Sequence, residues 1–341
     1  MTACARALAA IVLGVGLSGC TPLLRKAENT PPLVWPAAPD APRIAFVTSF
    51  SKPEDLGIDR GFFQRAADLL FGRDESRLVR PMAVVAVGDV LYVADPGAKG
   101  VHRFDQKQGS HELIHAAGGG PLPSPVALAL GEAGEVYVSD SALAAVFVIR
   151  PGAKEAVPLA LAARLGQPTG IAFDAATRRL FVVDTSAHCV NVFGPDGALV
   201  SSFGGRGTGE GEFNYPTLIW RTPQGRLYVT DSLNFRIQSF DDRGRFLAKF
   251  GGLGDGSGDL PRQKGVATDH YGHVYIVDSL FHALQVFDDH GRFLLSLGGM
   301  GRARGEFWLP TGLFIGADDK IYIADSYNQR VQVLRYIGGP T

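Results

Sequence analysis

The chain has 341 residues, 46% of them hydrophobic, with 43 glycines and 21 prolines. This length fits either two ordinary domains or one large all-β domain, and the many glycines and prolines favour a chain that reverses direction every few residues. The formal net charge of −1 argues against nucleic-acid binding, because phosphate contacts require a basic surplus gathered on one face. We therefore expect no DNA or RNA partner.

Residues 1–19 have the pattern of an export signal. Arg6 supplies a positive charge, and the apolar run that follows it is too short to span a bilayer. The tetrapeptide LSGC that ends at Cys20 resembles the bacterial lipobox. This resemblance implies cleavage before Cys20 and lipidation of its thiol, and an ordinary cleaved signal with an incidental cysteine is the alternative.

Residues 20–42 form a predicted tether between the lipid anchor and the folded domain. The segment is rich in proline and poor in patterned apolar residues, which is the composition of a semi-rigid extended linker. Thr21, rather than an aspartate, follows Cys20, and this resembles the pattern that directs lipoproteins to the bacterial outer membrane. Removal of the signal leaves Cys20 and Cys189 as the cysteines of the mature chain, so we expect no disulfide in the fold.

Two short elements are predicted ahead of the main body of the chain. Residues 43–50 (RIAFVTSF) have the apolar and β-branched character of a strand. Residues 59–72 read as a short helix, because Asp59 can cap its start, a broad apolar side follows, and Gly72 can end it. We expect this helix to pack on the folded domain, and docking to a membrane or a partner is the alternative that its apolar side allows.

The main body of the chain is a six-fold repeat. A segment of the type Leu-Tyr-Val-x-Asp recurs with its aspartate at intervals of 45, 44, 47, 47 and 47 residues. One period, residues 217–250, contains four short strand-like runs separated by turn-forming residues. Four strands per period form one blade of a β-propeller, so six periods predict six blades. The repeated aspartates are Asp95, Asp140, Asp184, Asp231, Asp278 and Asp325.

The best-formed repeats resemble NHL repeats. The resemblance rests on PTGIAFD at residues 168–174, DSLNFRIQ at 231–238 and DSYNQRVQ at 325–332. The resemblance covers residues 81–337. With the six repeats it implies an all-β fold, a single six-bladed β-propeller of four-stranded antiparallel blades over residues 43–341. Because the sixth repeat lacks a fourth strand, residues 43–50 are expected to supply the outer strand of blade six and to cover its open edge.

The repeated aspartates have a local structural task whatever the function. Each ends the second strand of its blade, where its carboxylate can accept backbone N–H groups in the turn to the third strand. Asn234, Arg236, Asn328 and Arg330 are expected mainly to fasten turns and neighbouring blades. Contact of the two arginines with a ligand is the alternative, which keeps Arg236 and Arg330 in the candidate binding surface.

Few side chains suited to catalysis or metal binding are expected around the axis of the predicted propeller. A zinc site needs about three His or Cys ligands and a calcium site needs several inward carboxylates, so we predict no metal, no other cofactor and no catalytic residue. His270, His273 and His290 are expected in turns of blade five on the opposite face, where a metal site is a minor alternative. The innermost strands are expected to begin at Met82, Val126, Thr169, Thr217, Lys264 and Thr311.

Two homologous glycine-rich loops, residues 204–216 and 298–310, carry the most distinctive surface chemistry. Phe213 and Phe307 are expected to fill gaps between blades, which leaves arginines and other aromatic residues to face outward. Arginine with tyrosine and tryptophan is typical of protein interfaces, and a solvated rim is the alternative. The candidate partner-binding face comprises Arg206, Tyr215, Arg236, Arg262, Lys264, Arg302, Arg304, Trp308 and Arg330.

These features predict a non-catalytic binding or scaffold lipoprotein that presents its loops to another extracytoplasmic protein. The repeat layout resembles that of lipoproteins in electron-transfer or cell-envelope assemblies, which implies an envelope protein as the partner. The alternative is a metal-dependent lyase or lactonase-like enzyme that uses the central channel. That second resemblance is one of architecture, and a fold does not carry a function with it.

Overall fold

The computed structural model describes residues 32–59 and 75–338, and all but the first of these belong to one folded unit, Leu33–Thr341. The expected export signal, Cys20 and the body of the expected helix over 59–72 lie outside the described residues. Helical structure in the described ranges consists of three 3₁₀ turns, η1 (Pro53–Leu56), η2 (Ser232–Asn234) and η3 (Ser326–Asn328). None of them has the length and apolar character that a bilayer-crossing helix needs.

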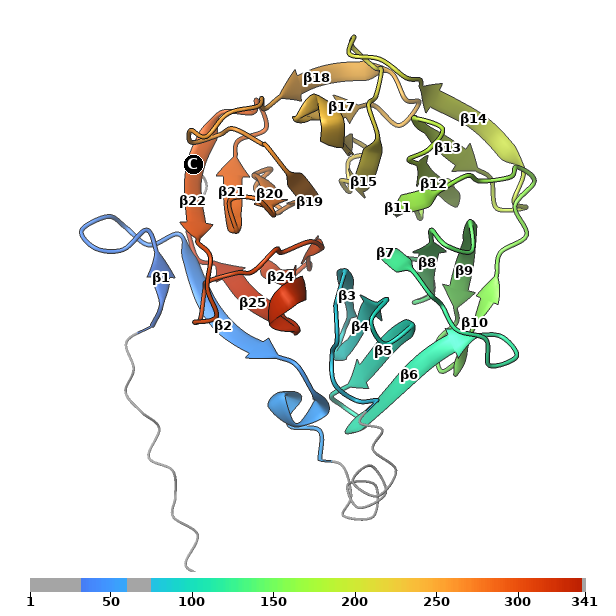
Figure 1. Ribbon diagram of the computed structural model, residues 1–341, viewed down its shortest axis with the longest axis horizontal. Coiled ribbons are helices and arrows are strands. Elements are labelled where there is room, and N and C mark those ends of the chain that lie inside the picture. Colours follow the sequence, from blue (N-terminus) through green and yellow to red (C-terminus); the bar gives the residue numbers. More distant parts are fainter. Residues whose placement is uncertain (1–31, 60–74, 339–341) are drawn as a thin grey trace, which may run out of the picture. The chain divides into compact units, whose positions relative to one another are not determined.

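The folded unit consists of six blades arranged around an axis (Figure 1). From inner to outer strand, blades one to three are β3 (Ala83–Val87), β4 (Val90–Asp95), β5 (Gly100–Asp105) and β6 (Ser110–Ala116); β7 (Pro125–Leu130), β8 (Val136–Asp140), β9 (Ala145–Ile149) and β10 (Glu155–Pro158); and β11 (Pro168–Asp174), β12 (Arg179–Asp184), β13 (Cys189–Phe193) and β14 (Leu199–Gly204). Blades four to six are β15 (Pro216–Arg221), β16 (Leu227–Asp231), β17 (Arg236–Phe240) and β18 (Phe246–Phe250); β19 (Gln263–Thr268), β20 (Val274–Asp278), β21 (Ala283–Phe287) and β22 (Phe293–Gly298); and β23 (Leu313–Ile315), β24 (Lys320–Asp325), β25 (Arg330–Tyr336) and β2 (Ile44–Phe50). The predicted all-β fold with six four-stranded antiparallel blades is confirmed.

The core lies between the blades. The second and third strands of each blade are buried on both faces, so they read as near-continuous apolar runs such as VYIVD in β20. Side chains from neighbouring blades meet there, for example Phe181 and Val183 of blade three with Ile219 and Val229 of blade four. A single blade could not bury these faces alone, and closure of the ring therefore stabilises every blade.

Blade six is closed by β2, the strand predicted over residues 43–50. β2 pairs antiparallel with β25, with Ile44 opposite Tyr336 and Phe50 opposite Val331 (Figure 1, blue beside red). A further strand that we did not predict, β1 (Val34–Trp35), pairs with the outer side of β2. Its residues fall in the region assigned to the tether, but Trp35 packs on the core of blade six and against Gly305, and this anchors the segment.

Blades one and two share one sheet because their outer strands pair with each other. β6 and β10 run parallel, with Glu155 opposite His115 and Ala156 opposite Ala116. The N–H of Ala117 extends this contact by donating to the carbonyl of Ala156 over 2.8 Å. Each short strand thereby covers part of the other's edge, and unpaired edges are the parts of a sheet that most readily recruit other chains.

The inner strands pack closely around the axis. A Cβ added at Gly170 would lie 2.7 Å from the backbone of β15, and one added at Gly312 would lie 2.3 Å from the carbonyl of Met82. Hydroxyl groups also cross between blades, since Thr185 donates to the carbonyl of Pro216 over 2.7 Å and Thr230 to that of Lys264 over 2.9 Å. The result is a narrow channel with a well-defined wall.

Candidate functional site

The loops that enter the blades and the turns that follow the repeated aspartates lie on one face of the ring, which we call the loop face. The six aspartates hold this face together, because each buried carboxylate accepts a backbone N–H from the loop that enters its own blade. The N to O distances are 2.7 Å from Val79 to Asp95, 3.0 Å from Ser124 to Asp140, 2.6 Å from Gly166 to Asp184, 2.7 Å from Asn214 to Asp231, 2.9 Å from Arg262 to Asp278 and 2.8 Å from Trp308 to Asp325.

The turn to the third strand follows the same path in all six blades. Its fourth residue after the aspartate has a left-handed φ between 50° and 57° in every repeat, although none of these residues is glycine. In blades one, two, three and five the aspartate also accepts N–H groups from this turn, as expected. Burial alone would raise the pKa of Asp184, but hydrogen bonds from Gly166, Gln167 and Ser186 outweigh it and hold that pKa below its ordinary value.

Arg236 and Arg330 use their side-chain donors inside the protein, in the fastening role expected mainly for them. Nε of Arg236 donates to Asp231 over 2.7 Å, and its Nη atoms donate to the carbonyls of Thr208 and Gly209 over 2.8 and 2.7 Å. Arg330 repeats this arrangement with Asp325 and the carbonyls of Arg302 and Ala303. Each guanidinium therefore fastens the glycine-rich loop to the turn, and its donors are used inside the protein.

The two glycine-rich loops have a common architecture. Phe213 and Phe307, at equivalent positions, are fully buried, as expected for residues that fill gaps between blades. Gly204 lets the chain approach Phe213, since a Cβ there would lie 2.5 Å from the ring. Above this buried layer the guanidinium of Arg302 lies 5.3 Å from the centre of the Trp308 ring, which in turn lies 5.9 Å from the ring of Tyr327.

The remaining residues of the predicted face do not form one group. Arg206, Tyr215, Arg262 and Arg302 are exposed on the loop face. Arg304 points elsewhere, because its guanidinium lies 5.9 Å from the ring of Phe46 on the outer strand β2. Lys264 is half-buried in the inner strand β19, directly before Gly265 of the cavity wall.

The sequence analysis missed a set of exposed apolar side chains on the loop face. Leu233, Leu280 and Tyr327 each stand two residues after the repeated aspartate of blades four, five and six, and each is about half exposed, at 51%, 53% and 52%. Blades one to three have glycine, alanine and serine at this position. Comparing the repeats at this position would have found the difference. With two exposed residues of the intervening loops they form what we call the apolar arc: Leu233, Leu253, Leu280, Met300 and Tyr327.

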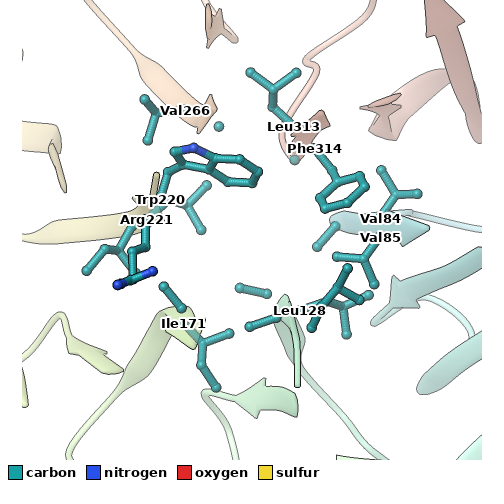
Figure 2. Close-up of a pocket in the computed structure, with 18 of the residues that line it drawn as sticks. Val84, Val85, Leu128, Ile171, Trp220, Arg221, Val266, Leu313 and Phe314 are labelled. Atoms are coloured by element: carbon teal, nitrogen blue, oxygen red, sulfur yellow. The ribbon is translucent and has the colours of Figure 1, made fainter. Parts of the chain in front are cut away.

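The central channel holds a cavity of about 210 Å³ between the inner strands (Figure 2). The indole N–H of Trp220 donates to Thr268 over 2.9 Å, and the Trp220 ring lies 6.0 Å from that of Phe314. Arg221 is the charged group among the described residues that line the cavity, and it forms an ion pair with Asp174 over 2.8 Å. We missed Arg221 because we considered where the inner strands begin, whereas it stands at the end of one.

Comparisons with known proteins agree on the architecture. A family model described as a 6-bladed beta-propeller matches residues 263–336. The fold is thus a six-bladed β-propeller. Among curated proteins, none matches this sequence significantly.

Several solved propellers are similar to this chain in fold. Virginiamycin B lyase from Staphylococcus aureus is 14% identical with a TM-score of 0.55, over 76% of this chain and 96% of that one. An auxiliary nutrient binding protein from Bacteroides thetaiotaomicron is 12% identical with a TM-score of 0.61, over 76% and 70% of the two chains. A gluconolactonase from Xanthomonas campestris is 16% identical with a TM-score of 0.58, over 76% and 86%. Propellers at this level of identity serve both catalysis and binding, so these matches show the fold alone.

The three histidines of blade five lie beside three different carboxylates. In blade five His270 lies 2.7 Å from Asp319, His273 lies 2.7 Å from Asp269, and His290 lies 2.5 Å from Asp289. These are three different carboxylates in three places. In the described part of the chain, ligand atoms of Asp288, Asp289 and His290 come within 4.8 Å of one another on a hairpin turn, where the last two residues are exposed.

Proposed function

We propose that this propeller is a non-catalytic binding protein that presents the loop face of blades four to six to a protein partner. The observation that carries the proposal is the apolar arc. Its members recur at equivalent positions on three consecutive blades, whereas blades one to three have small residues at the equivalent turn position. Exposed apolar side chains gathered in one region are typical of protein interaction sites.

The surroundings of the apolar arc favour a protein surface as the partner. Trp308 lies close to Tyr327 of the arc, with Arg302 over the Trp308 ring. Tryptophan, tyrosine and arginine are the residues that most often dominate the energetics of protein interfaces. These side chains rest on loops that buried phenylalanines and arginines hold in place, so little order has to be gained on binding.

The location of this activity is part of the proposal. The export signal over residues 1–19 and the lipobox that ends at Cys20 support a lipid-anchored protein of the cell envelope. A partner would then be another extracytoplasmic protein of an envelope assembly, within reach of the tether.

Site-specific photo-crosslinking in the cell that makes the protein tests this proposal. A photoreactive amino acid at position 280, in the apolar arc, should crosslink to one partner reproducibly. The same amino acid at position 143 is the control, because Leu143 is also exposed on the loop face, at 45%, but lies in blade two. Equal crosslinking at both positions, or none at position 280, would show that blades four to six do not bind a partner.

Binding by purified protein gives the second measurement. The combined Leu233→Glu, Leu280→Glu and Tyr327→Glu variant should weaken binding to the crosslinked partner by at least about tenfold, since each change removes an apolar contact and buries a charge. Leu143→Glu should leave the affinity unchanged. A triple variant that binds like the parent protein would contradict the proposal.

A further inference from the structure

The channel is chemically unlike the loop face, and it offers a second, smaller binding site. Apolar side chains from the inner strands of the blades line its cavity, among them Val84, Leu128, Ile171, Val266, Leu313 and Phe314 (Figure 2). Its volume of about 210 Å³ exceeds the roughly 150 Å³ of an apolar cavity that binds benzene. A small apolar body of one ring or a short alkyl chain would therefore fit.

The end of the channel away from the loop face is electrically neutral. Arg221 is the last residue of β15 and Asp174 is the last residue of β11, on the neighbouring blade. Their ion pair, 2.8 Å long, is largely buried, with 15% of the arginine side chain and 5% of the aspartate side chain exposed. A ligand that enters the channel meets no unbalanced charge at this end.

Two cations, Lys264 and Arg262, stand at the loop-face end of the inner strand β19, against one nearby carboxylate, Asp278. Lys264 immediately precedes Gly265, which lines the cavity, and its equivalent in blade one, Met82, lines the cavity as well. The ammonium of Lys264 and the guanidinium of Arg262 form no hydrogen bond or ion pair with residues in the described ranges. Burial lowers the pKa of Lys264, and the nearby charge of Arg262 lowers it further, against a smaller opposing effect of Asp278.

A half-buried lysine that forms no direct ion pair, next in the chain to a residue of an apolar cavity wall, indicates the chemistry of a ligand. We propose that the channel binds a small amphipathic carboxylate, with its apolar body between the inner strands and its carboxylate on Lys264, assisted by Arg262. An anion here would balance the cation that Asp278 leaves in excess. Charge-assisted hydrogen bonds to a carboxylate are among the strong polar contacts in proteins. This small-molecule site is additional to the protein-binding face proposed above and does not depend on it.

Trp220 provides a direct readout of ligand in the channel. The chain has 3 tryptophans, so in a Trp35→Phe, Trp308→Phe background the fluorescence comes from Trp220 alone, which lines the cavity. Titration with octanoate should change this emission saturably. Its neutral analogue 1-octanol should bind about 10- to 100-fold more weakly, because it lacks the charge-assisted bond.

Substitution of the cation tests the polarity of the site. Lys264→Met should weaken octanoate binding by about 10- to 100-fold and leave 1-octanol binding nearly unchanged, whereas Lys264→Arg should retain octanoate binding. Lys249→Met is the matched control, because Lys249 is a lysine of the outer strand β18 that is paired with Glu210 far from the axis. Octanoate binding that survives Lys264→Met would overturn the proposal.

Filling the cavity tests the apolar half of the site. Leu128→Phe should weaken octanoate and 1-octanol alike, because it occupies the space that both need. The comparison of octanoate with 1-octanol needs only the Trp35→Phe, Trp308→Phe background and no substitution in the cavity wall, so it decides the matter even if Leu128→Phe or Lys264→Met fails to fold. Equal binding of the two compounds, or no saturable change in Trp220 emission, would also overturn the proposal.

Discussion

Blades one to three and blades four to six share one backbone plan but differ in how they use it. All six turns after the repeated aspartate have the same left-handed residue, with φ between 50° and 57°. The aspartates from blade three to blade six are spaced by 47 residues, whereas the first two intervals are 45 and 44. The turns of blades four to six carry Leu233, Leu280 and Tyr327. The first half has small turn residues at this position and joins its outer strands β6 and β10 instead. Backbone geometry is thus common to the ring, whereas surface chemistry is specific to one half.

The aspartates provide the sharpest test of this comparison. Asp231 holds the buried cation of Arg236 as well as a backbone N–H, whereas Asp140 holds backbone N–H groups alone. Asp231→Ala should therefore lower the free energy of unfolding by about 3–5 kcal/mol, because it leaves a buried charge unpaired. Asp140→Ala should cost about 1–3 kcal/mol. Chemical denaturation measures both values, and equal losses would remove the distinction between the two halves.

His102 makes blade one sensitive to acid. It stands seven residues after its aspartate, where blades four to six have Gln238, Gln285 and Gln332. Burial, helped by His115, lowers the pKa of His102 from 6.5 to about 4. Between these two pH values the unfolded chain binds a proton that the folded chain does not, so this contribution to stability is complete above pH 6.5 and is lost as the pH falls towards 4.

His102→Gln, which copies blades four to six, should abolish this dependence. Between pH 7 and pH 4 the parent protein should lose about 3 kcal/mol more of its unfolding free energy than the variant does. Denaturation curves at several pH values for the two proteins provide the measurement. If the two proteins lost stability in parallel as the pH falls, His102 would take up its proton in the folded state as readily as in the unfolded chain.

The apolar arc should matter little for stability, in contrast to its proposed role in binding. Serine at positions 233, 280 and 327 removes exposed side chains that support no core, so each change should alter the free energy of unfolding by less than about 0.5 kcal/mol. Thermal and chemical denaturation of each variant checks this expectation. A large loss would show that the arc packs against the fold and is not an available surface.

The smallest effect is expected from removal of metal ions. The acidic turn of Asp288, Asp289 and His290 in blade five is matched by no equivalent group elsewhere in the described ranges, and its carboxylates already accept bonds from the turn and from Arg292. Chelation should therefore leave the unfolding temperature unchanged. Stoichiometric zinc or calcium that survives dialysis would favour the alternative of a metal-dependent lyase or lactonase.

The sequence predicted the fold well because its signals are local and repeated. Each aspartate marks the end of a second strand, and each turn between strands carries its own turn residues. It predicted the site less well, because the site depends on contacts between blades. Nothing near Arg221 in the sequence indicates that Asp174 of another blade neutralises it. Strand β1 was missed because Trp35 stands alone in a proline-rich segment.

The pairing of β2 with β25 sets an order for folding. Ile44 is synthesised among the first residues of the folded unit, and its partner Tyr336 among the last. The ring therefore cannot shut until almost the whole chain has been made, and until then β2 and the edge of β25 both lack a partner. Contacts so distant in the chain are slow to form, which makes this closure the step at which newly made molecules are most exposed to proteases and to pairing with each other.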